Sequence, residues 1–581
     1  MKINIDLSNY CMSYDLEKNH MRKKDELKLN TFLQNTFNQV NSRVSSTPLH
    51  HVSLCKSHVV FRFENHEQVV KVSKTHQLFL KKLLNNQPSI EISRDPLGQM
   101  IKTLYKKEYS FYYLYSSGGN GHKAAKEALL EKNLLDLFEK VKIRLVQNQT
   151  IEIDPSIQEK DFDALQKDFR LLDPSKFIDW CKNNGLIQED DVLKGFLGKV
   201  GSWCAEQWDH AQQSGDANKQ KSLASKQWLS DLFFGPIIFI KTLKSLVELK
   251  PEKIVCTQAL ANYAILLAIR VYNRFFLAKN KEPLKLHLYM TDMATKYSEH
   301  FFSSIKILPS ALRKNLILYA PVPHKHTDWY ELCHLPQTQV KALKVSQLPV
   351  RPAFIKAIEN FKPNFEHPHV QLNISCDDEL ILLNHLLKHQ TNQDVESSSH
   401  INLEKHSQNS IQLKYNMNAK DENLFIMLGS QPTESEIQKH IDDLISKARA
   451  QPNKDYHTFV FAGPFHAKKD CFYKRLHQFI LSKTSWPSNL KVVPLSYQDQ
   501  LQIVSLYLMC DTVTHSGGLT SMELLVIQKV LKKYPHIKRK RSIHVPSIKD
   551  RKPENCMPPW EKGNFHVLQK KIGAELLVLT S

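Results

Sequence analysis

Apolar residues recur along this chain as short runs, each followed by small or polar residues and then by a stretch with helical spacing. In the middle of the chain these runs predict five buried strands, at 109–115, 253–257, 284–290, 316–320 and 340–345. Between two of them, the apolar spacing of 260–276 predicts a helix. Strands that alternate with helices favour a parallel sheet covered on both faces.

A second set of such runs begins at residue 423. It predicts strands at 423–428, 457–462, 490–493 and 511–514, with helices at 434–448, 500–509 and 520–530. The fold class that we predict is therefore α/β, with two doubly wound Rossmann-like lobes facing across a cleft. The predicted divisions are an N-terminal extension (1–105), a first lobe (106–355), a polar insertion or linker (356–422) and a second lobe (423–581).

A glycine-rich turn follows the first predicted strand. Its members are Gly118, Gly119, Asn120 and Gly121. Glycines let a ligand approach the backbone, and the N–H groups of the next helix favour an anion or a polarised hydroxyl. His122, at the start of that helix, carries a side chain that titrates near neutral pH. An ordinary tight turn between strand and helix is the alternative reading.

A second small-residue turn lies before the predicted helix at 520–530. Ser516, Gly517 and Gly518 offer backbone N–H groups that could hold a phosphate without a metal. Because ligands of parallel sheets gather at the carboxyl ends of strands, we expect this turn, the first turn and Asp292 to lie near ligands.

Composition narrows the class of partner. At 581 residues the chain is too long for one ordinary core, and its formal charge of +20 implies an acidic partner. Membrane phospholipid, nucleic acid and sugar nucleotide all fit that charge, but no nucleic-acid-binding motif accompanies it. The basic residues are densest at Lys532, Lys533, Lys538, Arg539, Lys540 and Arg541. We interpret this cluster as a solvated face, with a patch for anionic lipid as the alternative.

Cysteine usage and hydropathy bear on the compartment. The ten cysteines include no CxxC pair or metal-like spacing, so we expect reduced thiols and no metal site. No apolar run is long enough to cross a bilayer, and the amino terminus does not resemble a signal peptide. We therefore expect a cytoplasmic protein. Peripheral attachment to a membrane and secretion as a bacterial effector stay open.

Five motifs line up in order with one family. Residues 118–124 (GGNGHKA) resemble the family's GGGHRA, and 291–292 its strand-ending Thr-Asp. Residues 347–354 (QLPVRPAF) resemble GLPIRPSF, 516–524 (SGGLTSMEL) resemble SGALTVSEL, and 558–564 (PPWEKGN) resemble PGQEEGN. The chain thus resembles the GT-B glycosyltransferases that include the lipid-II-forming N-acetylglucosaminyltransferase and the monogalactosyldiacylglycerol synthases. Asn120 departs from the family, which has glycine there.

This resemblance implies that the first lobe holds the acceptor and the second lobe the nucleotide sugar. His122 is then the candidate base, and Asp292 either orients it, acts as an alternative base or caps a helix. Glu523 would bind the ribose hydroxyls, while Glu561 and Asn564 would contact the donor sugar. The predicted donor-binding residues are Gly429, Ser430, Gln431, Ser516, Gly517, Gly518, Thr520, Glu523, Glu561 and Asn564.

The function that we predict is metal-independent, inverting transfer of a sugar from a nucleotide sugar, with UDP-sugar first, to a hydroxyl acceptor. No cofactor is expected besides this co-substrate. A membrane lipid is one acceptor class, and an anionic membrane surface one partner. The alternatives are a bacterial effector that glycosylates a protein, a UDP-sugar epimerase, and a GT-B scaffold that binds a membrane or partner without turnover.

Overall fold

The structure is a computed structural model of the chain. It describes strands within residues 2–93, the ranges 96–115, 120–147, 165–192, 228–258, 260–293, 305–321, 333–391, 401–407, 410–418, 420–428, 434–535, 539–545 and 556–579, and short pieces at 206–223, 295, 537 and 552–553.

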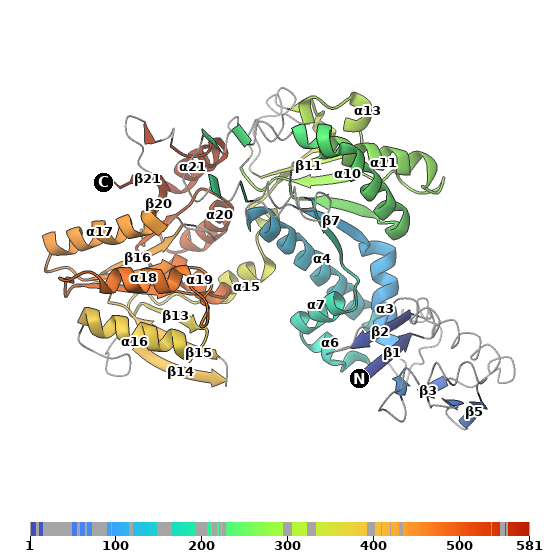
Figure 1. The fold of residues 1–581 in the computed structure, drawn as a ribbon, viewed down its shortest axis with the longest axis horizontal. Coiled ribbons are helices and arrows are strands. Elements are labelled where there is room, and N and C mark those ends of the chain that lie inside the picture. The colour runs from blue at the N-terminus through green and yellow to red at the C-terminus, as the bar shows by residue number, and fades with distance from the viewer. Residues whose placement is uncertain are drawn as a thin grey trace. The chain divides into compact units, whose positions relative to one another are not determined.

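The chain forms two compact units (Figure 1). Unit 1 comprises residues 1–110 and 133–187, and unit 2 comprises 111–132 and 188–581. Helix α4 (Asn120–Val146) therefore begins in unit 2 and ends in unit 1. The predicted N-terminal extension covers only the first of the two stretches that build unit 1.

Unit 1 contains a two-stranded and a four-stranded antiparallel sheet. The strands are β1 (Lys2–Asp6), β2 (Cys11–Asp15), β3 (Leu49–Leu54), β4 (His58–Phe63), β5 (Glu67–Lys71) and β6 (Ile90–Ser93), with orders β1-β2 and β5-β4-β3-β6. The helical elements are α3 (Pro96–Leu104), a π-helical turn (Tyr105–Tyr109), α6 (Phe169–Leu172) and α7 (Pro174–Asn183). Phe138 of α4 packs edge-on against Phe177 of α7, with ring centroids 5.3 Å apart.

The first sheet of unit 2 has six parallel strands in the order β12-β11-β10-β9-β7-β8. They are β7 (Phe111–Tyr115), β8 (Gln188–Asp191), β9 (Lys253–Cys256), β10 (Leu286–Tyr289), β11 (Leu316–Pro321) and β12 (Val340–Leu343). Its helices are α10 (Trp228–Leu249), α11 (Asn262–Phe275) and α13 (Ser310–Arg313), and α10 contacts α11 (Figure 1). The five strands predicted from apolar runs are confirmed.

The second sheet of unit 2 is also parallel, in the order β18-β17-β16-β19-β20-β21. Its strands are β16 (Glu422–Met427), β17 (Tyr456–Phe461), β18 (Leu490–Leu495), β19 (Thr512–His515), β20 (Lys540–Val545) and β21 (Glu575–Val578). Its helices are α17 (Glu434–Ala450), α18 (Phe472–Leu481), α19 (Gln500–Met509), α20 (Thr520–Leu531) and α21 (Pro559–Ile572). The predicted two-lobe α/β fold class is confirmed.

Strand order reverses once in each sheet. In the first sheet β7 lies between β8 and β9, and in the second β16 lies between β17 and β19. Parallel sheets bind ligands where the order reverses, outside the carboxyl ends of the two strands concerned. The turns after β7, β9, β16 and β19 are therefore the places to look for a site.

Residues 356–422, predicted to be a polar insertion or linker, contain regular secondary structure. They hold most of α15 (Pro352–Asn360), then β13 (His369–Ile374), α16 (Asp377–Thr391), β14 (Ile401–Ser407) and β15 (Ser410–Asn416), and the strands make an antiparallel sheet in the order β13-β15-β14. Val370, Leu372 and Ile374 alternate with more exposed residues and join the same core as the second parallel sheet. That alternation outweighs the polar composition on which the linker prediction rested.

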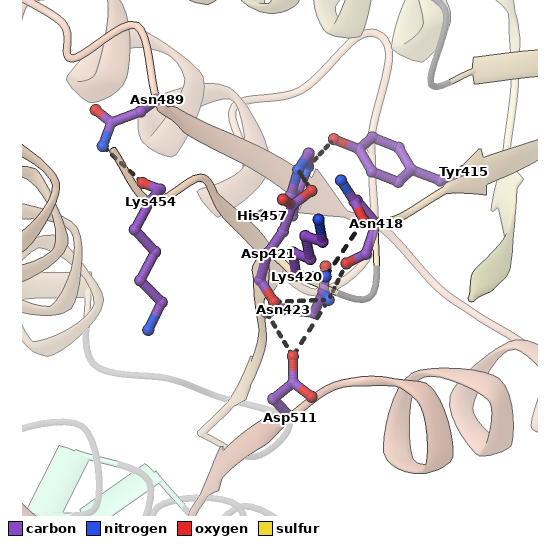
Figure 2. Close-up of polar contacts among 9 residues, drawn as sticks. All are labelled: Tyr415, Asn418, Lys420, Asp421, Asn423, Lys454, His457, Asn489 and Asp511. Atoms are coloured by element: carbon purple, nitrogen blue, oxygen red, sulfur yellow. Dashed lines mark hydrogen bonds and ion pairs between the residues drawn. The ribbon is translucent and has the colours of Figure 1, made fainter. Parts of the chain in front are cut away.

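A buried polar network connects this small sheet to the second parallel sheet (Figure 2). The Tyr415 hydroxyl donates to Nδ1 of His457 at 2.6 Å, and His457 Nε2 donates to Asp421 at 3.0 Å. Alongside, Asp511 accepts from the backbone and side-chain N–H groups of Asn423 at 3.0 and 3.2 Å. The side chains of Tyr415, His457 and Asp421 are joined in one chain of hydrogen bonds, so the network fixes how the two sheets pack.

The basic cluster is not one solvated face. Arg541, in β20, is buried and donates to the carbonyl of Tyr507 at 2.8 Å, while Arg539 pairs with Asp511. Lys532, Lys533 and Lys540 are exposed. The guanidinium groups therefore bind elements of the second sheet, because their forked donors fit backbone carbonyls and carboxylates.

Two further sequence-based expectations concern cysteine and the membrane. The seven cysteines in the described part of the chain are all reduced thiols: Cys181, Cys256, Cys333, Cys376, Cys471, Cys510 and Cys556. Among the helices that the structure describes, none has the length and apolarity needed to cross a bilayer.

Candidate functional site

His122 lies at the point where strand order reverses in the first sheet. It belongs to the first turn of α4, which follows β7, and it contacts Thr257, which follows β9. The ring Nδ1 is 2.5 Å from the Thr257 carbonyl oxygen, and the Thr257 hydroxyl donates to the His122 carbonyl at 2.9 Å. The first bond orients the imidazole, and the second fixes the backbone of His122 at the same sheet edge.

These contacts select the protonation state of His122. A carbonyl oxygen only accepts hydrogen bonds, so Nδ1 carries the proton and the neutral ring keeps its lone pair on Nε2. Burial lowers the pKa of His122, which favours this neutral form at neutral pH. The Thr291 hydroxyl lies 3.3 Å from the same Nδ1. His122 is therefore prepared to accept a proton through Nε2.

Asp292 follows β10 and is buried beside Thr291. Its carboxylate accepts from the Thr291 hydroxyl at 3.4 Å and from the Asn564 side chain at 3.0 Å. Burial raises the pKa of Asp292 to about 6, although both hydrogen bonds oppose that shift. Asp292 is thus poised between its charged and neutral forms near neutral pH.

Asn564 joins the edges of the two parallel sheets. This buried residue of α21 accepts from the backbone N–H of Met293 at 2.7 Å and donates to Asp292. Its amide also donates to the Gly517 carbonyl at 2.6 Å. One side chain therefore fixes the residues after β10 against the turn that follows β19.

The turn after β19 packs so closely on α21 that only glycine fits there. A Cβ added to Gly517 would lie 2.7 Å from the Cβ of Glu561, and one added to Gly563 would lie 2.2 Å from the Thr295 hydroxyl. Both distances are far below an ordinary contact. The Ser521 hydroxyl of α20 also donates to the Gly517 carbonyl, at 3.0 Å. The turn is thus held by α21 on one side and by the Ser521 hydroxyl of α20 on another.

Glu561 is the second carboxyl group of the site. Burial and the nearby charge of Asp292 raise the pKa of Glu561 to about 7. The Glu561 carboxyl group lies against the Gly517 turn, with Oε2 3.2 Å from the position that a Cβ of Gly517 would take. Two carboxyl groups that repel each other hold fewer than two negative charges near neutral pH.

Glu523 lies on the first turn of α20, within the electrostatic influence of Arg351. Its carboxylate accepts from the Tyr507 hydroxyl at 3.3 Å. Burial raises the pKa of Glu523, and the charge of Arg351, which precedes α15, opposes that shift. The predicted ribose ligand Glu523 thus lies within the electrostatic influence of Arg351, a residue of the segment 347–354 that carries part of the family resemblance.

The structure brings together His122, Asp292, Gly517, Glu561 and Asn564 from the predicted set. Gly121 faces the second sheet, since a Cβ on it would meet Leu519 at an ordinary 3.9 Å. Ser516 and Gly518 lie in the turn of Gly517, and Thr520 begins α20. Gly118, Gly119, Gly429, Ser430 and Gln431 lie outside the described residues, as does the side chain of Asn120, whose backbone begins α4.

Two residues of the site carry roles that sequence reasoning missed. Thr257 ends a predicted strand, and its carbonyl group fixes the His122 tautomer. His515, the last residue of β19, is buried with Nδ1 against the Ser516 carbonyl, and burial lowers the pKa of His515 to about 4. A histidine just before a glycine turn is a signal that could have pointed to it.

Comparisons with known proteins give no family and no curated relative. A scan against protein-family models found no match, and neither did a search of curated proteins. Among solved structures, the MurG of Acinetobacter baumannii matches at 10% identity and a TM-score of 0.29, over 59% of this chain and 64% of that one. The spinosyn rhamnosyltransferase SpnG complexed with thymidine diphosphate matches at 10% identity and 0.29, over 68% and 80%. The UDP-GlcNAc 2-epimerase of Methanocaldococcus jannaschii matches at 10% and 0.28, over 60% and 71%. TM-scores this low do not support an inference about function.

The site combines three chemical abilities. The neutral His122 ring can take a proton, the Gly517 turn offers backbone donors at the start of a twelve-residue helix, and the carboxyl pair can gain or lose a proton near neutral pH. Within the described residues, no group of three or more His, Cys, Asp or Glu side chains could hold a metal ion.

Proposed function

We propose that this protein is a glycosyltransferase that moves a sugar from a nucleotide sugar to a hydroxyl group, with inversion at the anomeric carbon. One observation carries the proposal. Asn564 binds both Asp292, beside the candidate base His122, and Gly517, in the candidate phosphate turn. A proton acceptor and an anion-binding turn held in one site are what displacement of a diphosphate by a hydroxyl requires.

In the proposed reaction, the acceptor hydroxyl lies against Nε2 of His122. Its oxygen forms a bond to the anomeric carbon as the bond from that carbon to the diphosphate oxygen breaks, and Nε2 takes the hydroxyl proton. The Gly517 and Gly518 amides and the dipole of α20 stabilise the charge that moves onto the diphosphate. This proposal needs no metal, because backbone donors receive the leaving group. Glu523 binds the nucleotide ribose.

UDP-sugar is the donor that we propose first, and a membrane lipid is the acceptor. The lipid proposal draws on the formal charge of +20, which favours an anionic surface. It also draws on α10, where Ile237 is 49% and Ile240 63% exposed, because exposed apolar side chains can enter the interface of a bilayer.

The test is transfer from a panel of radiolabelled UDP- and GDP-sugars, comparing the wild type with His122→Ala and Glu523→Ala. We expect His122→Ala to lose transfer but keep nucleotide binding, and Glu523→Ala to weaken nucleotide binding. Equal rates in all three proteins would refute the site assignment. A wild type that binds nucleotide without transfer or hydrolysis would favour a non-catalytic scaffold.

The acceptor needs a separate measurement. Co-sedimentation with vesicles of neutral and of anionic lipid should rise with anionic lipid and fall with salt, since surface charge is screened within about 8–10 Å at physiological ionic strength. Sedimentation that responds to neither variable would contradict the lipid proposal. Ile237→Ser with Ile240→Ser should lower binding to both kinds of vesicle.

A further inference from the structure

The chain passes from one apolar core to the other directly beside the candidate site. Leu286 and Leu288 of β10, and Met290 after them, lie in the core of the first sheet. Met293 is fully buried and belongs to the core of the second sheet. Asp292 immediately precedes Met293, so the burial of Met293 in the second core determines where Asp292 lies.

Two contacts with α21 hold the same residues. The Asn564 side chain accepts from the Met293 backbone N–H at 2.7 Å and donates to Asp292 at 3.0 Å. The Thr295 side chain lies on the α-carbon of Gly563, where an added Cβ would be 2.2 Å from its hydroxyl oxygen. Apolar burial, hydrogen bonds and close packing thus all fix the residues after β10 to elements of the second sheet.

The Asn564 amide uses both of its N–H hydrogens within the chain. Because a backbone N–H only donates, the amide atom that faces Met293 is the oxygen, and the NH₂ group faces Asp292 and the Gly517 carbonyl. An amide NH₂ group donates two hydrogen bonds, and these two partners take them. Asn564 is also only 1% exposed. A donor sugar could receive a hydrogen bond from this amide only by displacing one of the two partners.

We propose that Asn564 and Met293 are positioning residues, which hold Asp292 at a fixed distance from the Gly517 turn, and that Asn564 does not bind the donor sugar. This inference rests on the proposed function and deepens it, because it gives Asn564 a role other than the sugar contact that the resemblance implies.

The positioning reaches the candidate base through Thr291. The Thr291 hydroxyl donates to Asp292 at 3.4 Å and lies 3.3 Å from Nδ1 of His122. Consecutive contacts therefore connect the Gly517 turn to His122 through Asn564, Asp292 and Thr291. The proposed reaction needs the base and the leaving diphosphate in line, and a misplacement of about 1 Å can lower the rate of such a step about 100-fold.

The experiment separates rate from affinity. It measures kcat, and by isothermal titration calorimetry the Kd for the nucleotide and for the nucleotide sugar that the wild type prefers in the transfer panel. The variants are Asn564→Ala, Asn564→Asp, Met293→Ala and Met293→Leu. The controls are Met417→Ala, which truncates a methionine buried in the same core but after β15, and Asn360→Ala at the exposed end of α15.

We expect Asn564→Ala and Met293→Ala to lower kcat by about 10- to 100-fold and to leave both Kd values unchanged. Asn564→Asp should be no more active than Asn564→Ala, because it also lacks the donor to Asp292 and adds a second carboxylate there. Met293→Leu should recover most of the rate, since it keeps the apolar volume. Both controls should keep the wild-type kcat, even where Met417→Ala lowers the melting temperature.

The sugar-contact alternative gives a different pattern. If Asn564→Ala weakens binding of the nucleotide sugar but not of the nucleotide, or if Asn564→Asp keeps the wild-type rate, Asn564 is a sugar ligand and the inference is refuted while the proposed function stands. A wild-type kcat in Met293→Ala, or an equal loss in Met417→Ala, also refutes it. The two positions are tested separately, so one variant that does not fold leaves the other decisive. A folded wild type that neither binds nor transfers from any donor refutes the proposed function and this inference together.

Discussion

Substituting Gly517 by alanine should break the contact between the turn after β19 and α21. The new Cβ would lie 2.7 Å from the Glu561 Cβ, whereas ordinary contacts begin near 3.4 Å. Both atoms are attached directly to backbone, so no side-chain rotation relieves the clash, and the turn and the helix must separate by roughly 1 Å. Overpacking of this kind costs about 1–3 kcal/mol. We therefore expect Gly517→Ala to lower the melting temperature by several degrees.

The neighbouring glycine supplies the control. A Cβ on Gly518 would meet nothing within 4 Å, so Gly518→Ala should leave the melting temperature nearly unchanged. Differential scanning fluorimetry measures both, and a double-mutant cycle with Glu561→Gly should recover the loss, because that change removes the opposing Cβ. Equal melting temperatures for Gly517→Ala and Gly518→Ala would refute the close contact between the turn and α21.

Three further predictions concern the base and two buried networks. His122→Gln should lower turnover by about 10²- to 10⁴-fold and leave nucleotide affinity unchanged. In the wild type, kcat/KM should decrease at pH values below the lowered pKa of His122, because the base is then protonated. A rate that does not depend on pH would contradict this role. Tyr415→Phe removes the hydroxyl that donates to buried His457 and should lower the free energy of unfolding by about 1–3 kcal/mol. The midpoint of unfolding in urea should fall accordingly, and an unchanged midpoint would show that this bond is dispensable. His544, whose Nε2 lies 3.1 Å from the Glu436 carboxylate, lowers the pKa of Glu436 to about 2. The stabilisation from this pair is therefore complete above pH 4.5 and is lost as the pH falls towards 2. Glu436→Gln should flatten the fall in melting temperature between about pH 5 and 3, and parallel curves for the two proteins would argue against that pairing.

The sequence predicts those elements whose residues carry their own signal. Phe111–Tyr115 is an apolar run that becomes the buried strand β7, and the helical spacing of 434–448 becomes α17. Strand β8, with the sequence QEDD, escapes prediction because it lies at the sheet edge and pairs through its backbone to β7. The small sheet within residues 356–422 was not predicted, because overall polarity hid the alternation in β13.

The candidate site could be predicted only as separate pieces. Glycine turns and a histidine at a helix start are local patterns, so His122 and Gly517 could be singled out. The bonds that combine them join residues 135 positions apart, for His122 and Thr257, and 272 apart, for Asn564 and Asp292. No local pattern encodes such pairings, since they depend on which strands become neighbours in each sheet.

Helix α4, which runs through both units, determines what a deletion of the amino terminus would leave behind. Tyr109 bonds to Asp136, and Glu108 pairs with Lys140 at 2.8 Å and Arg144 at 3.1 Å, so the second half of α4 depends on residues that precede β7. A chain shortened to begin at β7 would keep that half of the helix but lose these contacts. Unit 1 is thus built from two separate stretches of sequence, 1–110 and 133–187, that must be kept or removed together.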